Sequence, residues 1–389
     1  MDSKKLIALE ESVIMQSYGR APIVLEKGKG CWLWGSDGKK YLDLVGALAT
    51  CSIGYANKEH AEAICAQAKK LVNTTNLYFT EPQILLAAKL QQLSGMGKSF
   101  FSNSGSEAVE VALKLARKAT GKKGVIATER AFHGRTMAAL AATWKENYKD
   151  YCAPHVPGFK HVPFNDVDAL EKAVDESTAA FIVEPIQGES GIIVPEKGYL
   201  KKVREICSRK GILLIVDEVQ TGTARTGKFF AFEHEGIKPD IAALAKGIGN
   251  GVSIGVTIAE QGIDFGKGQQ GSTFGGNPLA CSAALATIEF IEKNKLAGNA
   301  EKMGAYAVEK LEKMKKEISA IKEVRGKGLM IGIELHGDAK KIVEKCREKG
   351  VLVNAATDST VRLLPPLIIS KEEIDFGLKV IGGALKELK

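Results

Sequence analysis

The chain has 389 residues, of which 45% are hydrophobic and 26% charged, a composition typical of a folded globular protein and too apolar for a largely disordered one. The net charge of +8 is a small excess of Lys and Arg, and Lys alternates with Glu near the C-terminus as on solvated helix faces, so nucleic-acid binding is disfavoured. No apolar run approaches the roughly 20 residues of a membrane span, and the first residues lack a signal-peptide pattern, so a cytoplasmic protein without membrane contact is expected.

Cysteine and histidine spacing disfavours two further classes of protein. The seven cysteines are scattered, and no two have the C-x-x-C spacing of a zinc site. The six histidines include no H-E-x-x-H pair. We therefore expect neither a disulfide framework nor a metal centre.

The predicted elements begin with short apolar stretches. Residues 32–34 and 41–44 are rich in aromatic and aliphatic side chains and predict strands at the edge of a sheet. Residues 99–102 predict another short strand, which ends at an Asn-Ser-Gly turn signal. Beyond this turn, apolar residues recur at helical spacing and predict a helix: Val109, Ala112, Leu113 and Ala116.

Three apolar runs in the middle of the chain predict strands of a parallel sheet. Residues 180–183, 212–216 and 241–245 show no polar alternation, as expected when both faces of a sheet are covered. Ligands of such sheets bind outside the carboxyl ends of the strands. Each run is followed there by a charged residue: Glu184, Asp217 and Lys246.

The C-terminal part has a different pattern. From about residue 284, a long stretch rich in Lys, Glu, Ala and Leu predicts an amphipathic helix. Residues 329–333 and 351–353 then predict strands of a smaller α+β unit. Together with the alternating strands and helices before it, this pattern predicts an α/β protein.

The segment Ser104-Gly105-Ser106-Glu107 opens the predicted helix and has two interpretations. Ser104 and Glu107 match the capping box, which would make the segment a helix start and nothing more. Alternatively, backbone N–H groups and the Ser106 hydroxyl would bind a phosphate at the positive end of the helix.

A partial match to a nucleotide-binding motif follows the strand that ends at Asp217. Residues 222–228 satisfy G-x-x-x-x-G-K, the pattern of a nucleotide-binding P-loop. However, Phe229 stands where a P-loop needs Ser or Thr to hold Mg²⁺, and the acidic strand directly precedes the loop. A nucleotide-binding protein is therefore only a remote alternative.

Five residues have side chains suited to chemistry or recognition, each with a structural alternative. Burial can lower the pKa of Lys246 and free its amine to bond with a carbonyl carbon. Asp217 can hold a heteroaromatic nitrogen protonated, or cap a loop. Arg135 suits a carboxylate or phosphate, or a surface ion pair, while neighbouring His133 is expected to be structural. Arg362 lies in an apolar run and needs a partner.

Glu189 is a candidate partner for Arg362, although the sequence alone does not pair them.

Six segments in register resemble the class III (ω-amino) aminotransferases, which are pyridoxal-phosphate enzymes of fold type I. The resemblance extends from Tyr18 and Pro22 to the run that contains Arg362, nearly the whole chain. The segments are residues 104–108, 132–136, 184–189, 217–222, 246–247 and 271–278.

This resemblance implies a large domain with a mostly parallel sheet flanked by helices and a smaller α+β domain. Residues 46–283 would form the large domain that binds pyridoxal 5'-phosphate. Residues 284–389 would form the small C-terminal domain, and residues 1–45 an N-terminal segment packing with it. The resemblance further implies a homodimer with a shared active site.

The resemblance implies that Lys246 and Asp217 are catalytic. Lys246 would bond covalently to the cofactor and then move a proton, and Asp217 would pair with the ring nitrogen. The remaining cofactor-binding residues implied are Gly105 and Ser106 at the phosphate, Thr273 at the phosphate of the neighbouring subunit, Phe132 and Val219 on the ring faces, and Gln220 at the phenolic oxygen.

The substrate residues implied are Tyr18, Arg135, Glu189 and Arg362. Arg135 would hold the carboxylate far from the reacting carbon, and Arg362 would hold the α-carboxylate of glutamate. When an ω-amine is bound instead, Glu189 would neutralise Arg362.

Leu48 favours one substrate within the family. Members acting on ornithine resemble one another in a tyrosine here that holds the free α-amino group, so an aliphatic residue favours N-acetylornithine. The implied reaction is ping-pong transfer to 2-oxoglutarate, giving N-acetylglutamate 5-semialdehyde and glutamate, as in arginine biosynthesis. Ornithine, 4-aminobutyrate and a lysine precursor on an acidic carrier protein remain alternatives.

Overall fold

The computed structural model describes residues 2–387, and its largest element is a seven-stranded sheet. The three strands predicted in the middle of the chain lie side by side and parallel in this sheet. Only β10 runs against its neighbours. In spatial order the strands are β4 (Lys98–Ser102), β10 (Gly255–Ala259), β9 (Ile241–Leu244), β8 (Leu213–Asp217), β7 (Thr178–Val183), β5 (Gly124–Thr128) and β6 (Phe159–Val162).

Both faces of this sheet are covered by helices, which explains why its strands lack polar alternation. Successive residues of β7 point to opposite faces: Phe181 and Val183 into one core cluster, Ala180 and Ile182 into another. Helix α5 (Gly105–Thr120), as predicted, packs its apolar stripe on the second face. The first face is covered by α4 (Glu81–Ser94), α8 (Tyr199–Lys210) and α9 (Pro278–Lys293).

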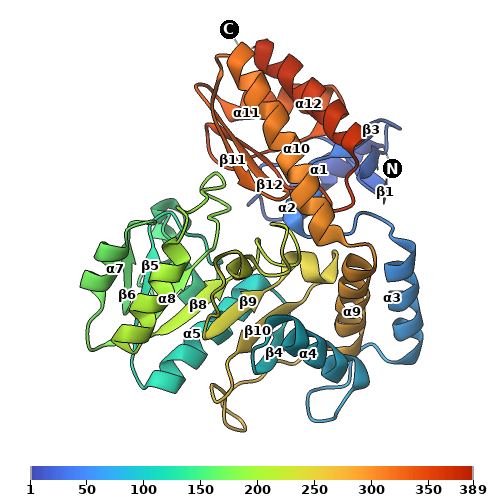
Figure 1. Ribbon diagram of the computed structural model, residues 1–389. Coiled ribbons are helices and arrows are strands. Elements are labelled where there is room, and N and C mark those ends of the chain that lie inside the picture. Colours follow the sequence, from blue (N-terminus) through green and yellow to red (C-terminus); the bar gives the residue numbers. More distant parts are fainter. Residues whose placement is uncertain (1, 388–389) are drawn as a thin grey trace.

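Two four-stranded sheets form a second region, which lies above the large sheet in Figure 1. One sheet joins the N-terminal strands to the C-terminal part in the order β1 (Leu25–Lys29), β2 (Trp32–Gly35), β3 (Lys40–Asp43) and β13 (Val351–Leu352). The prediction that residues 32–34 and 41–44 are edge strands is wrong, because β2 and β3 are the inner strands of this sheet. The other sheet has the order β11 (Ile321–Lys327), β12 (Met330–Leu335), β15 (Thr360–Leu363) and β14 (Asn354–Ala355).

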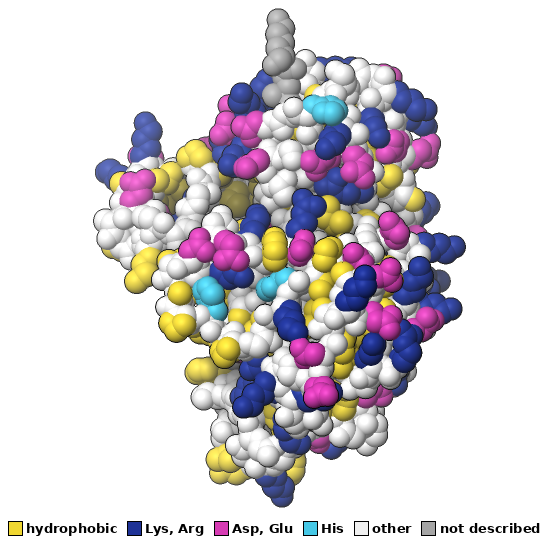
Figure 2. Space-filling model, turned by 90° about the vertical axis from the view of Figure 1, so that its left-hand side faces the viewer, with side chains coloured by type: hydrophobic (Ala, Val, Ile, Leu, Met, Phe, Trp, Pro, Cys, Tyr) yellow, Lys and Arg dark blue, Asp and Glu magenta, His cyan; other side chains and the backbone are white. Residues whose placement is uncertain are grey.

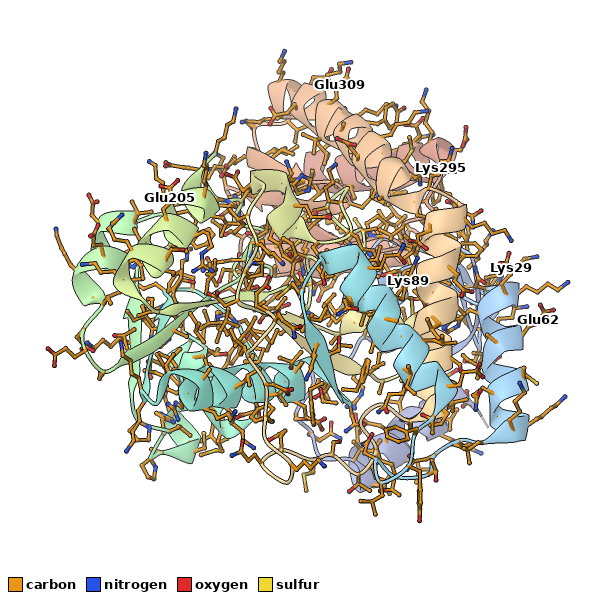
Figure 3. All side chains as sticks on the ribbon, turned by 60° about the horizontal axis from the view of Figure 1, so that its bottom comes forward. Lys29, Glu62, Lys89, Glu205, Lys295 and Glu309 are labelled. Atoms are coloured by element: carbon orange, nitrogen blue, oxygen red, sulfur yellow. The ribbon has the colours of Figure 1, made fainter. Side chains whose placement is uncertain are left out.

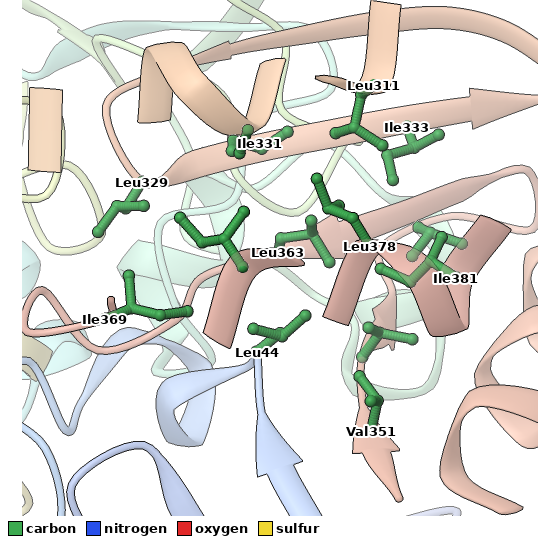
Figure 4. Close-up of a cluster of buried hydrophobic side chains, with 14 of the residues drawn as sticks. Leu44, Leu311, Leu329, Ile331, Ile333, Val351, Leu363, Ile369, Leu378 and Ile381 are labelled. Atoms are coloured by element: carbon green, nitrogen blue, oxygen red, sulfur yellow. The ribbon is translucent and has the colours of Figure 1, made fainter. Parts of the chain in front are cut away.

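The core of this second region draws on both ends of the chain. Figure 4 shows Leu44, just after β3, among side chains from β12, β15 and the last helix, α12 (Lys371–Lys386). Burying these side chains removes apolar surface from water, and each Å² buried stabilises the folded state by about 25 cal/mol. The first strands therefore pack with the last hundred residues and away from the large sheet that follows them in sequence.

The long amphipathic stretch after residue 284 forms two helices instead of one. Helix α9 ends at Lys293, and α10 (Leu296–Glu317) begins after Lys295, whose φ is +51°. Helix α9 packs under the large sheet, whereas α10 packs in the second region. The break lets one stretch of chain serve two cores. The remaining helices are α1 (Ser3–Val13), α2 (Gly46–Ala49), α3 (Lys58–Lys70), α6 (Met137–Ala142), α7 (Val167–Ala173) and α11 (Ala339–Glu348).

Charged side chains are dispersed over the surface. On the face shown in Figure 2, Lys and Arg are intermixed with Asp and Glu. In Figure 3, Glu62, Glu205 and Glu309 point outward from their helices. Within residues 2–387, no helix is both long and apolar enough to cross a bilayer.

Candidate active site

A cavity of about 320 Å³ lies at the carboxyl ends of β7, β8 and β9. The loops after these parallel strands and the start of α5 form its walls, as expected for a sheet of this kind. The residues lining it include eight that the sequence singled out: Gly105, Ser106, Phe132, Arg135, Asp217, Val219, Gln220 and Lys246.

Lys246 lies two residues after the end of β9 and lines this cavity. Its φ of +46° is unusual for a residue with a side chain and stores strain at the site. Burial lowers the pKa of its ammonium group, although Glu189 and Asp217 oppose this effect. No hydrogen bond or ion pair holds its Nζ within residues 2–387. The amine is thus easier to deprotonate than an ordinary lysine and is available to a ligand.

Asp217, at the end of β8, is almost fully buried and has a fixed orientation. Its Oδ1 accepts the N–H of Val219 at 3.0 Å, and its Oδ2 lies 2.8 Å from Nδ1 of His133. His133 was expected to be structural, yet it lines the cavity and holds the carboxylate. In the sequence, only its position beside Phe132 and Arg135 indicated that His133 would lie at the cavity.

The start of α5 is shaped for an anion, and only half of the predicted capping box forms. Ser104 accepts the N–H of Glu107 at 3.2 Å, but the Glu107 carboxylate accepts the N–H of Asn103, not that of Ser104. At Gly105 an added Cβ would lie 2.8 Å from Val219, so only glycine fits. The backbone N–H groups here carry the partial positive charge of a helix N-terminus.

Arg362 is buried in the middle of β15 and meets Glu189 from the loop after β7. Its Nη1 donates to Glu189 Oε1 at 2.6 Å, and its Nε donates to Asn354 at 2.9 Å. Burial raises the pKa of Glu189, but Arg362 and Lys246 outweigh burial and hold it below its usual value. The hypothesis that these two residues pair therefore agrees with the geometry.

Gln220 connects this ion pair to the cavity. Its Nε2 donates to Glu189 at 3.3 Å, and its Oε1 accepts from Arg362 at 3.4 Å. Since Gln220 also lines the cavity, the pair lies directly behind the cavity wall.

Arg135 lies at the cavity beside two aromatic rings. Its guanidinium carbon is 3.7 Å from the ring centre of Tyr148, a favourable cation–π position. Tyr148 also meets Phe132 edge-on, with ring centres 6.0 Å apart. Within residues 2–387 Arg135 forms no ion pair, so its charge is available to an anionic ligand. Sequence reasoning missed Tyr148, because no pattern places it near Arg135.

Besides Glu189 and Arg362 behind the cavity wall, three residues singled out by the sequence lie outside the cavity of this chain. Tyr18 is 72% exposed, and Thr273 is also exposed. Leu48 is 43% exposed and belongs to a turn, Gly46–Ala49, in which all four residues have positive φ.

The partial P-loop match at residues 222–228 has no P-loop geometry. Its N–H groups bond within the loop, as from Ala224 to the carbonyl of Phe229, and are not turned toward a ligand. No α-helix follows, only the short 3₁₀ turn Ala231–Glu235, and Arg225 in the loop is buried. Phosphate binding by a P-loop needs free N–H groups at a helix start, so this alternative is wrong.

The cavity fits the cofactor that the resemblance implied. The half-buried amine of Lys246, without a partner in the described residues, suits an aldehyde, and the fixed, buried carboxylate of Asp217 suits a protonated ring nitrogen. The start of α5 suits a phosphate. Phe132 and Val219, both on the cavity wall, can cover a flat ring.

Comparison with known proteins gives one consistent family. The family model described as aminotransferase class-III matches residues 13–385. An acetylornithine aminotransferase from Methanosarcina mazei is 50% identical, covering 97% of this chain and 96% of its own. One from Methanothermobacter thermautotrophicus is 46% identical over the full length of both chains.

Solved structures agree with this family. The ornithine aminotransferase from Toxoplasma gondii ME49 has a TM-score of 0.96 and 34% identity, covering 99% of this chain and 95% of that one. The acetylornithine aminotransferase from Elizabethkingia anophelis has a TM-score of 0.90 and 35% identity over the whole of both chains.

Proposed function

Because this chain belongs to the class III aminotransferases, which use pyridoxal phosphate, we propose that it transfers the ω-amino group of N-acetylornithine to 2-oxoglutarate. The products are N-acetylglutamate 5-semialdehyde and glutamate, in a ping-pong reaction of arginine biosynthesis. The observation that carries the chemistry is the half-buried amine of Lys246, which has no partner within residues 2–387 and faces a cavity that also contains Asp217. Full-length relatives named acetylornithine aminotransferase support the substrate.

When bound, pyridoxal phosphate supplies an aldehyde that bonds to amines and a ring that accepts electrons from the substrate carbon. Lys246 would hold this aldehyde carbon and, once released, move a proton to or from the substrate carbon. Asp217, kept in place by His133 and the Val219 N–H, would keep the ring nitrogen protonated. Gly105 and Ser106 would bind the phosphate at the start of α5.

Three further cavity residues would orient the ring. Phe132 and Val219 would lie on its two faces, and Gln220 would bond its phenolic oxygen. Because Gln220 also touches Glu189 and Arg362, the ring and the ion pair would share one contact.

The two arginines explain how one site would serve two different amines. Arg135 would hold the carboxylate distant from the reacting carbon in either substrate, and Arg362 would hold the α-carboxylate of glutamate. N-acetylornithine has no carboxylate on its reacting carbon, so Arg362 would then remain paired with Glu189. A buried arginine left without a partner would be costly, so the pair stabilises the site in this half of the reaction.

Leu48 and Tyr18 would select the amine if they close over the cavity. An aliphatic Leu48 offers no hydroxyl to a free α-amino group, which favours the uncharged acetylated amine. Ornithine remains the second candidate, because several similar solved structures are ornithine aminotransferases.

A homodimer would explain the exposed residues that the cofactor needs. Thr273 is exposed here and would reach the phosphate of the neighbouring subunit. Large apolar side chains are also exposed close to it in the fold, among them Leu77, Phe79 and Phe274. Exposed apolar patches of this kind mark interaction surfaces. Analytical ultracentrifugation would give twice the mass of one chain, and Phe79→Asp would reduce it to the single mass with loss of activity.

The visible spectrum of the purified protein tests the whole proposal. Glutamate and N-acetylornithine, added separately, should bleach a yellow protein, whereas ornithine and 4-aminobutyrate should do so poorly. A protein that stays colourless with added pyridoxal phosphate contradicts the chemistry. A yellow protein bleached best by another amine contradicts only the substrate.

A further inference from the structure

Glu184 is a fully buried carboxylate at the end of β7 whose two oxygens bind two different loops. Oε1 accepts the backbone N–H of Phe132 at 2.9 Å, and Oε2 accepts that of Gly188 at 3.1 Å. Both loops border the cavity. Charge-assisted bonds from N–H to a carboxylate are among the stronger hydrogen bonds in proteins.

The two loops carry different parts of the proposed machinery. The loop after β5 contains Phe132, one face of the ring site, and His133, which holds Asp217. The loop after β7 contains Gly188 and then Glu189, which pairs with Arg362. Two other bonds also join the loops, from Gln187 to the carbonyl of Glu129 and from Ser190, which follows Glu189, to that of Arg130. Glu184 differs from both, because it binds the N–H of Phe132 itself together with that of Gly188.

We propose that Glu184 is a positioning residue that couples the ring site at Phe132 to the Glu189–Arg362 pair. This inference rests on the proposed function, since it concerns how that reaction alternates between two amines. The physical reason is the number of acceptors. The two N–H donors meet different oxygens of Glu184, and a carboxylate supplies an acceptor at each of these positions. A glutamine supplies one acceptor and turns an N–H₂ donor toward the other N–H.

The charges around Glu184 make this coupling sensitive to pH. Burial raises the pKa of Glu184 to about 7, with Asp217 adding to the effect and His133 opposing it. Lys246 is the other charged group close enough to interact with it. Below about pH 7 one oxygen becomes an O–H donor that faces a backbone N–H, so the coupling should weaken as the pH falls.

The expected effect falls on one half of the reaction. If Gly188 shifts, Glu189 no longer neutralises Arg362, which is needed when N-acetylornithine is bound. The α-carboxylate of glutamate would instead pair with Arg362 itself, and for this Glu189 must move away from Arg362. Displacement of Phe132 would slow both halves alike. The ratio of the two specificity constants, N-acetylornithine over glutamate, therefore reports the coupling and not general damage.

The chain offers a matched control in Glu218. This carboxylate is equally buried, and burial raises its pKa to about 7 as well. However, it accepts from Thr221 at 2.5 Å and from the N–H of Phe232 at 2.9 Å, and it does not line the cavity. Glu218→Gln should cost as much in folding as Glu184→Gln without touching the coupling.

Single-turnover measurements of both variants, loaded with pyridoxal phosphate, test the proposal. We expect Glu184→Gln to lower the ratio of the specificity constants, N-acetylornithine over glutamate, about 10-fold. Glu218→Gln should leave this ratio within about 2-fold of the wild type. A tenfold change corresponds to about 1.4 kcal/mol. Equal ratios in the two variants would overturn the proposal. If Glu184→Gln does not fold, the wild type decides: its ratio should fall between pH 8 and pH 6, and a constant ratio would also overturn the proposal.

A second measurement needs no substrate. Hydrogen exchange of the cofactor-free protein should be at least about 10-fold faster at the amides of Phe132 and Gly188 in Glu184→Gln, because a lost bond of roughly 1.5 kcal/mol has this effect. The same amides should be unchanged in Glu218→Gln. Unchanged exchange in both variants contradicts the coupling even if the substrate is another amine. A wild type that neither amine bleaches contradicts the proposed function instead.

Discussion

The charged groups of the cavity reach it differently from the large sheet and from the second region. Asp217 ends a strand of the large sheet, and Glu184 and Lys246 stand one and two residues after the ends of its two neighbours. Arg362 lies inside β15, where every residue is buried, and reaches the same place through packing between the two regions. In the first case local structure positions the side chain, and in the second case a tertiary interface does.

This difference extends to a second arginine. Arg225 is buried in the loop after β8 and donates to the carbonyls of Leu329 and Pro365 in the second region. Burial lowers its pKa to about 9, with no carboxylate beside it. Both arginines therefore link the two regions, but only Arg362 has an anionic partner. Groups at strand ends should thus govern the chemistry common to both amines, and Arg362 the choice between them.

The largest expected effect comes from a strand end. Lys246→Ala should lower both halves of the reaction at least about 10⁴-fold, because it removes both the covalent attachment and the proton transfer. Stopped-flow bleaching with each amine measures this loss. Lys228→Ala, at the exposed end of residues 222–228, is the control and should retain full rate; an equal loss in both variants would argue against a special role for Lys246.

Asp217→Asn should have the next largest effect. An amide cannot hold the ring nitrogen protonated, so both halves should slow by about 10²-fold or more, by a similar factor. The absorption spectrum of the bound cofactor should shift as well. A large difference between the two amines would argue against a role common to both.

Arg362→Gln should separate the two halves. The rate with glutamate should fall roughly 30- to 1,000-fold, since losing one partner of a buried charge contact costs about 2–4 kcal/mol. The rate with N-acetylornithine should change much less. Arg204→Gln, which breaks an ion pair with Asp240 away from the cavity, serves as control. Equal losses of rate with both amines would mean that Arg362 does not govern the choice between them.

Leu48→Tyr should change substrate preference by a smaller factor. The added hydroxyl can accept a bond from a free α-amino group, so the ratio of ornithine to N-acetylornithine turnover should rise about 10-fold. Leu25→Tyr changes a leucine of similar exposure in β1 and should leave the ratio unchanged. No change with Leu48→Tyr would mean that other residues select the amine.

The last prediction concerns stability and does not involve the reaction. The pKa of Glu218 is about 7 in the folded protein, against about 4.5 when unfolded, so the folded state binds more protons between these values. Stability should therefore fall as pH rises from about 4.5 to about 7, by roughly 3 kcal/mol for this group. Glu218→Gln should reduce the slope of the melting temperature across this range, measured by calorimetry, while Glu184, whose pKa burial also raises to about 7, keeps its own contribution; an unchanged slope would assign the dependence to other groups.

Much of the large sheet was predictable, because its strands are short apolar runs whose period and punctuation are local. The predictions failed where partners came from distant residues. β3 became an inner strand because β13, some 310 residues later, pairs with it, and β2 lies between β1 and β3. The amphipathic stretch broke at Lys295 because its two halves enter different cores.

The sequence by itself determined that Lys246 and Asp217 lie close together, because they stand at or just beyond the ends of buried parallel strands, whose carboxyl ends must share one edge of the sheet. Only the tertiary structure decided which charges meet. Glu189 and Arg362 are 173 residues apart, and His133 reaches Asp217 from 84 residues away. Such contacts depend on how the two regions and the cavity loops pack, since burial leaves each charged group stable only beside the partner that packing brings to it.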